Sequence, residues 1–97
     1  MPTYVLPEDR ANLLINDADF RQIIYNDMLH VTSIIEEIIS GNVVIMSQEE
    51  LDAMDDDFKR DVVTHNVAFL ETLVSQDVWT SEDMTAVNNA ITNGNAY

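Results

Sequence analysis

Residues 18–41 read ADFRQIIYNDMLHVTSIIEEIISG, and this stretch decides the fold. Most of its large apolar side chains recur at intervals of three or four residues, which puts them on one side of an α-helix. They lie at positions 20, 23, 24, 28, 31, 34, 35, 38 and 39. Asn16 or Asp17 suits the helix start, because a short side-chain oxygen accepts from the unpaired amides of the first turn. Gly41 suits the end, in the left-handed conformation. The stretch predicts a helix over residues 18–40.

A shorter helical segment is expected just before this helix. Pro7 fits a first-turn position, and Glu8 and Asp9 favour the positive end of the helix dipole. The apolar side chains expected to face inward from this segment are Leu13, Leu14 and Ile15.

The next helix start is marked by SQEE at residues 47–50, a capping box in which Ser47 and Glu50 satisfy each other's backbone amides. Met46 and Leu51 stand at the positions of a hydrophobic staple. Apolar residues continue at helical spacing as far as Val74, which predicts a helix over residues 48–75.

The length of that helix leaves two alternatives open. Unbroken, it measures about 42 Å, whereas a compact domain of this size has a radius of gyration of about 12 to 13 Å. Either the helix breaks near Asp55, Asp56 and Asp57, which are suited to cap a new start, or the molecule is elongated and leans on a partner. We favour the partner.

The last helix is expected over residues 81–93. It begins in the capping sequence TSED at residues 80–83, with Ser81 interpreted as a cap, and Gly94 marks its end. The tail from Asn93 to Tyr97 is expected to fray. The apolar connection at residues 42–46 is either a loop or a short strand paired with residues 4–6, since five residues do not show a period.

The charge and composition of the chain argue against nucleic-acid-binding and membrane proteins. The 97 residues contain 18 acidic and 4 basic side chains, which gives a net charge of 4 − 18 = −14, and 46% are hydrophobic. We expect one domain over residues 1–97, without direct nucleic-acid binding, because carboxylates repel phosphates. No long apolar run or signal-like N-terminus is present and cysteine is absent, so a cytoplasmic location without membrane contact is expected.

Two carboxylate–imidazole pairs, Asp27 with His30 and Asp61 with His65, have the spacing of metal ligands on one helix face. An antiparallel hairpin turning at residues 43 and 44 separates the histidines by about 12 Å along the axis, so they do not share an ion. We expect no metal and no cofactor, with both histidines partly buried. Asp27 comes level with Arg60 in that hairpin, which predicts an ion pair between the helices.

The segment EELDAMDDD at residues 49–57 is an acidic run without a base. It does not match a calcium-binding EF-hand loop, because the required glycine is absent. The candidate site is an acidic docking face made by Glu49, Glu50, Asp52, Asp55, Asp56 and Asp57. Three explanations for the charge compete: solubility, docking onto a basic protein surface, and mimicry of nucleic acid.

The sequence lacks catalytic motifs, and one of its predicted helices has an apolar face wider than a single neighbour covers. No serine lies in a nucleophile elbow and no glycine loop for phosphate exists, so we expect no enzyme and no catalytic residue. The adjacent isoleucine pairs at residues 23–24, 34–35 and 38–39 widen the apolar face beyond one seam. A homo-oligomer, with a dimer favoured, would cover the excess.

Residues 66–97, and above all the phrases VWTSEDM at 78–84 and AVNNAI at 86–91, resemble small uncharacterised acidic proteins of tailed bacteriophages. The resemblance implies an accessory role in infected bacteria, in the virion or the host cytoplasm. It assigns no functional residue.

These patterns predict an all-α fold, a three- or four-helix bundle built on a long antiparallel helical hairpin. The function we expect is a non-enzymatic protein–protein interaction or assembly protein. The alternative is an acidic nucleic-acid mimic that inhibits a basic DNA- or RNA-binding protein, and a metal-dependent activity using His30 or His65 comes third.

Overall fold

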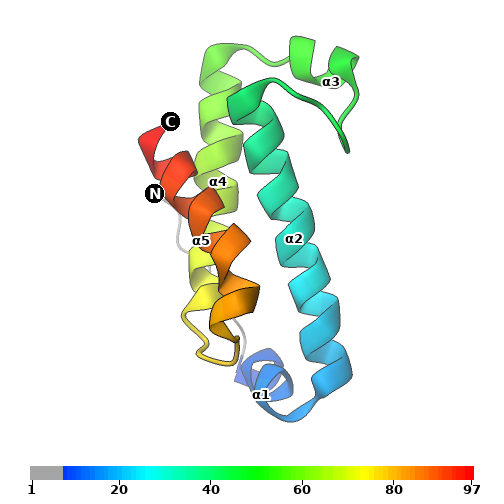
Figure 1. Ribbon diagram of the computed structural model, residues 1–97, viewed down its shortest axis with the longest axis vertical. Helices are drawn as coiled ribbons and strands as arrows, with labels where there is room; N and C mark the ends of the chain where they lie inside the picture. Colours follow the sequence, from blue (N-terminus) through cyan, green and yellow to red (C-terminus); the bar gives the residue numbers. More distant parts are fainter. Residues whose placement is uncertain (1–7) are drawn as a thin grey trace.

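A computed structural model describes residues 8–97, and these residues form five α-helices and no β-strand (Figure 1). The predicted all-α fold is therefore confirmed. Within the same residues, no helix combines the length and the apolar composition that crossing a bilayer requires. The helices are α1 (Glu8–Asn16), α2 (Ala18–Ser40), α3 (Gln48–Asp52), α4 (Asp56–Val74) and α5 (Ser81–Ala96).

The long helices α2 and α4 run antiparallel, and α5 packs against both of them to complete a small bundle (Figure 1). Helix α1 packs against the beginning of α2 at one end of the molecule, while α3 lies at the opposite end. The molecule measures 41 × 26 × 20 Å and has a radius of gyration of 14.0 Å. With 23 residues, α2 is about 34 Å long and spans most of the longest dimension.

Both ends of α2 lie where the sequence predicts them. The Asp17 carboxylate accepts hydrogen bonds from the backbone N–H of Asp19 (3.0 Å) and Phe20 (3.1 Å), so Asp17 and not Asn16 is the N-cap. Gly41 has a φ of 80°, and its N–H donates to the Glu37 carbonyl at 2.8 Å. A residue without Cβ adopts this left-handed conformation at little cost, which ends the helix.

The core lies along the seam of α2, α4 and α5, with α1 closing one end. Burying an aliphatic side chain of this size contributes about 1.5 to 3 kcal/mol, so the apolar stripes found in the sequence stabilise the bundle. The largest side chains buried completely are Leu14, Met28, Ile35, Val63, Val67, Leu70 and Val87.

The helix predicted over residues 48–75 is broken, and the unbroken alternative is wrong. Helix α3 ends at Asp52 and α4 begins at Asp56, with the Asp55 carboxylate accepting from the Phe58 N–H at 2.8 Å. The break removes the argument that an overlong helix needs a partner. The predicted ion pair between Arg60 and Asp27 is also wrong, because Arg60 pairs with Asp57 on its own helix at 3.8 Å.

The last helix is longer than predicted. Helix α5 continues through Gly94 to Ala96, so the predicted end and the frayed tail are both wrong. A Cβ on Gly94 would collide with the Val67 side chain of α4. Glycine is therefore present for close approach between α5 and α4 and does not end the helix.

The structure also corrects the predictions for the inward face of α1, the cap of α5 and the connection at residues 42–46. In α1 only Leu14 is buried, whereas Leu13 and Ile15 are 41% and 57% exposed, because neighbours on a helix point about 100° apart. The cap of α5 is Thr80, in a reciprocal capping box with Asp83, and Ser81 is the first helical residue. Residues 42–46 form a loop and not a strand, and the predicted strand partner at residues 4–6, like Pro7, lies outside the described residues.

Candidate functional site

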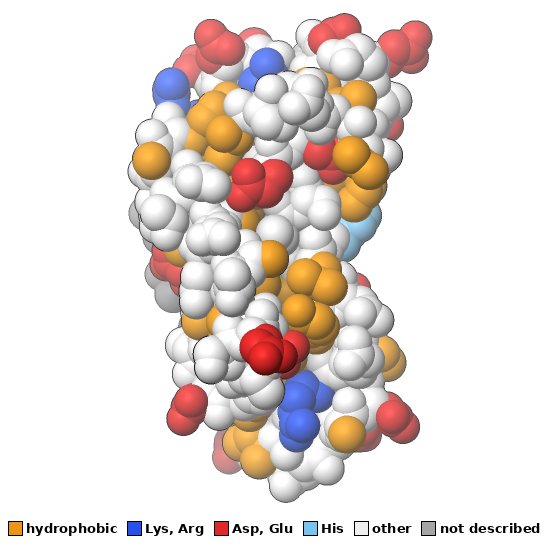
Figure 2. Space-filling model, in the orientation of Figure 1, with side chains coloured by type: hydrophobic (Ala, Val, Ile, Leu, Met, Phe, Trp, Pro, Cys, Tyr) orange, Lys and Arg blue, Asp and Glu red, His pale blue; other side chains and the backbone are white. Residues whose placement is uncertain are grey.

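The acidic docking face predicted from the sequence is exposed at one end of the bundle. Figure 2 shows acidic side chains gathered along the top of the view, over α3 and the start of α4. All six predicted residues are exposed: Glu49, Glu50, Asp52, Asp55, Asp56 and Asp57. The structure therefore brings them to one end, on two short stretches of helix.

Several of these carboxylates also hold the local backbone in place. The Ser47 hydroxyl accepts from the Glu50 N–H at 3.1 Å and donates to the Glu50 carboxylate at 3.2 Å, which is one half of the predicted capping box. Asp52 accepts from the Gln48 side chain at 3.0 Å. Because Asp55 caps α4, its carboxylate has a structural role that the rest of the acidic face does not share.

The connection between α2 and α3 is organised by a buried glutamate that the sequence analysis missed. Glu37 is only 4% exposed, and its Oε1 accepts from the backbone N–H groups of Val44, Ile45 (2.7 Å) and Met46 (3.1 Å). Three consecutive amides pointing at one oxygen form an anion-binding cradle. The loop is thus wrapped around the carboxylate of the helix that precedes it.

Hydrogen bonding keeps this carboxylate ionised. The bond from Val44 has the largest effect and lowers the pKa of Glu37, while burial raises it. The bonds from Met46 and Ile45 and the charge interaction with His30 lower the pKa further, and the net direction is downward. Glu37 therefore carries a full negative charge at neutral pH inside the loop.

A signal for this arrangement was present in the sequence. Glu37 lies one turn before Gly41 within an otherwise aliphatic run, and the loop after Gly41 has no side chain able to satisfy its own amides except Asn42. Unpaired amides in a loop need an acceptor. A search for that acceptor leads to Glu37.

The anchored loop holds two aliphatic side chains out in solvent. Val44 is 86% exposed and Ile45 is 46% exposed, whereas the next residue, Met46, is buried in the core together with Leu51. Figure 2 shows hydrophobic surface at the right edge of the view, over the loop below α3. Phe58 at the start of α4 is 52% exposed at the same end of the bundle. We call residues 41–58 the loop end.

The two histidines are not placed as predicted. His30 and His65 are both exposed and not partly buried. Among residues 8–97, no group of three or more histidine, aspartate or glutamate side chains is arranged to hold a metal ion. Neither histidine is therefore combined with further ligands into a centre.

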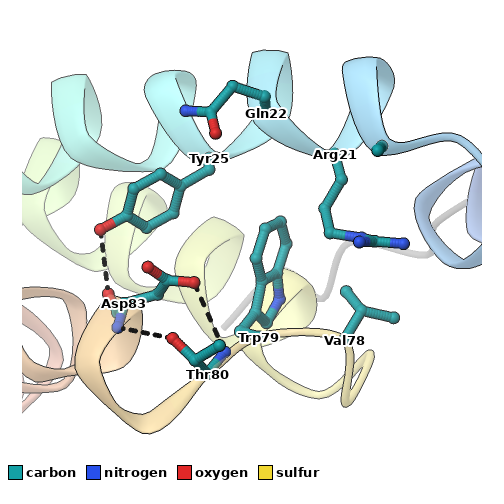
Figure 3. A pocket seen from close by; sticks show the side chains of 8 residues that line it. Arg21, Gln22, Tyr25, Val78, Trp79, Thr80 and Asp83 are labelled. Carbon is teal, nitrogen blue, oxygen red and sulfur yellow. Dashed lines mark hydrogen bonds between the residues drawn. The ribbon is translucent and has the colours of Figure 1, made fainter.

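A second candidate is a pocket of about 290 Å³ near the other end of the bundle. Figure 3 shows Arg21 and Tyr25 extending from α2 toward Trp79 and Asp83. The Tyr25 and Trp79 rings lie 6.1 Å apart, between centroids, and the Tyr25 hydroxyl donates to the Asp83 carbonyl at 3.3 Å. The pocket therefore lies where α2 meets the segment leading into α5.

The polar groups of this pocket are already engaged within the protein. Arg21 donates to the carbonyls of Leu14 (2.8 Å) and Ile15 (2.9 Å), which fastens the end of α1 to α2. The Trp79 indole N–H donates to the Leu73 carbonyl at 2.8 Å. These bonds join elements of the fold, so the pocket serves as a structural junction.

No family model, curated protein or solved structure matches this chain.

Proposed function

We propose that this protein is a non-enzymatic binding protein that docks its loop end onto an apolar, basic-rimmed surface of another protein. The observation that supports the proposal is the loop anchored by Glu37, which holds Val44 and Ile45 in solvent. A buried carboxylate and three backbone amides are used to fix the shape of a loop whose side chains face outward.

The cost of this arrangement supports a role in recognition. Three backbone hydrogen bonds offset the desolvation of the ionised Glu37 carboxylate, but exposing Val44 and Ile45 forgoes the burial of two aliphatic side chains. That exposure adds nothing to the core. A loop fixed before binding loses little conformational entropy when a partner covers it, which favours affinity.

The surrounding charge indicates the chemistry of the partner. The acidic docking face borders the loop, and the whole chain carries a net charge of −14. Acidic groups at the rim of an interface accelerate encounter with a basic surface and exclude acidic ones. The partner surface therefore combines an apolar pocket for Val44 with positive charges around it.

The test is photo-crosslinking from inside the loop end. A photoreactive amino acid replaces Val44, and a matched one replaces Ile23, which is 58% exposed on α2. We expect one partner to be captured from position 44 and not from position 23. Capture should fall when Glu49, Asp52 and Asp56 are changed to Gln, Asn and Asn, and persist when Asp61, Glu71 and Glu82 are neutralised instead.

Other outcomes would contradict the proposal. Equal capture from both positions would indicate nonspecific contact. A nucleic-acid mimic would lose its target on charge neutralisation, yet keep it when Val44 is changed to Ser, because mimicry depends on charge alone.

Self-association through the wide face of α2 stays a separate prediction. Among the paired isoleucines, Ile35 and Ile38 are buried and only Ile23 is largely exposed, so α4 and α5 already cover most of that face. Sedimentation equilibrium tests it: a mass of 11.0 kDa at every concentration would exclude the dimer.

A further inference from the structure

A hollow of about 210 Å³ lies beside Val44, between the last turns of α2 and the beginning of the loop. Five of the six residues that line it have polar side chains. The lining residues are Ser33, Glu36, Glu37, Ser40, Asn42 and Val44.

Glu37, one of the residues that line the hollow, has an incomplete set of hydrogen bonds. While Oε1 of Glu37 accepts three backbone bonds, Oε2 is buried and has no hydrogen-bond partner among the described residues. Buried carboxylate oxygens without a donor are rare in folded proteins, and each one calls for an explanation such as an unseen ligand.

The electrostatics of the hollow favour a cation. Glu36 is half-buried and its Oε1 accepts from the Asn93 side chain at 3.2 Å, a neutral donor that leaves the negative charge in place. The hollow also lies at the negative end of the α2 dipole, and the last turn of α2 contains no basic residue. Two carboxylates and a helix C-terminus therefore act together, against the smaller charge interaction of Glu37 with His30 of α2.

We propose that this hollow receives the ammonium group of a lysine side chain supplied by the docked partner; the inference rests on the proposed function. An ammonium donates three hydrogen bonds and accepts none. The apolar surface in the hollow suits the methylene chain of a lysine, and its glutamate, serine and asparagine side chains offer acceptors for the charged end. Glu36 supplies the more accessible carboxylate, and Glu37 adds a negative charge that is only partly compensated. The lysine would lie next to Val44, so the apolar and charged contacts of the partner come from one short segment.

The test uses a probe without any apolar docking surface. N-acetyl-lysine amide is titrated into the ¹⁵N-labelled full chain at constant ionic strength. We expect saturable shifts of the backbone amides of Ser40, Asn42 and Val44. Glu36→Gln keeps an acceptor for Asn93 and removes the charge, and it should weaken binding about three- to fivefold, whereas Glu71→Gln should not change it.

Controls separate the ammonium from the rest of the probe. N-acetyl-norleucine amide, which lacks the ammonium, should give no shifts at these amides. Equal shifts with norleucine or with Glu36→Gln would overturn the inference, and so would tighter binding of MgCl₂ or CaCl₂ than of the lysine probe. Because no partner protein is used, failure here leaves the crosslinking result at position 44 unaffected, and the two proposals fail separately.

Discussion

Glu37 holds the loop after α2 in shape through backbone hydrogen bonds from Val44, Ile45 and Met46. Its pKa is lower in the folded protein than the ordinary value of 4.5. A carboxyl group of this kind stabilises the fold at any pH above its unfolded-state pKa, and that stabilisation is lost as the pH falls through the folded-state pKa. The loop of residues 42–46 is therefore held by an interaction that acid removes.

Replacing Glu37 with Gln should lower the urea midpoint at neutral pH, because a neutral amide oxygen accepts the three backbone bonds less strongly than a carboxylate. The variant should also lose less stability than the wild type between about pH 5 and pH 3, since the titrating group is gone. Urea melts across that range measure both effects. Glu71→Gln, at an exposed position of α4, is the control, and identical acid sensitivity of Glu37→Gln and the wild type would refute the role of Glu37.

Gly94 marks the closest approach of α5 to α4. Alanine is favoured over glycine within a helix by about 1 kcal/mol, but overpacking against Val67 costs about 1 to 3 kcal/mol. Gly94→Ala should therefore destabilise the protein by up to about 2 kcal/mol in urea unfolding. Asn95→Ala, at an exposed position one residue further on, should be neutral or slightly stabilising.

A double variant tests whether contact with Val67 causes the loss of stability expected for Gly94→Ala. If the added methyl group acts through its collision with Val67, then Gly94→Ala should cost less in a Val67→Ala background, where the side chain is gone. The same cost in both backgrounds would mean that the collision is not responsible.

At the scale of the elements, the break between α3 and α4 depends on Asp55. Asp55→Ala should cost about 1 kcal/mol of stability, because the Phe58 amide loses its acceptor, whereas Asp55→Asn should cost only a few tenths. Comparing urea midpoints of the two variants checks this. Equal losses would indicate that the charge of Asp55, and not its capping bond, stabilises the start of α4.

The element boundaries show what the sequence determines. Asp17 and Gly41 predict the ends of α2 because each signal is local, a cap and a left-handed glycine. The break at Asp55 appeared only as an alternative, since apolar spacing continues across it. Gly94 was misread as a stop because its role depends on Val67, which is remote in the sequence.

Only the part of the candidate site that has a local sequence signal was predictable. Glu49 and its acidic neighbours were recognised from composition, and the structure exposes them together. The anchored loop was not predicted from the sequence. Glu37 accepts hydrogen bonds from the main chains of Val44, Ile45 and Met46, and residue types do not reveal which backbone amides need an acceptor.

At the scale of the whole molecule, the charge of −14 predicts how salt affects stability. The Arg60–Asp57 ion pair is exposed and 18 acidic side chains face only 4 basic ones, so screening weakens mostly repulsion. Raising NaCl from about 0.01 to about 0.15 M shortens the Debye length from about 30 to about 8 Å. The melting temperature should rise, by about 4 to 8 °C for each kcal/mol of repulsion removed.

Thermal melts followed by circular dichroism at neutral pH measure this rise. A melting temperature that falls with added NaCl would mean that attractive charge pairs outweigh the repulsion. A variant with three exposed acids neutralised, at Asp61, Glu71 and Glu82, should show a smaller rise than the wild type.

The cradle around Glu37 is built entirely from main-chain donors, so its geometry does not depend on which side chains occupy positions 44 and 45. The backbone shape of this loop is therefore set independently of the side chains that it presents to solvent. If the loop docks as proposed, exchanging these two outward side chains should change its partner while the fold beneath stays the same. Two codon changes would then be enough to redirect the protein to a new target.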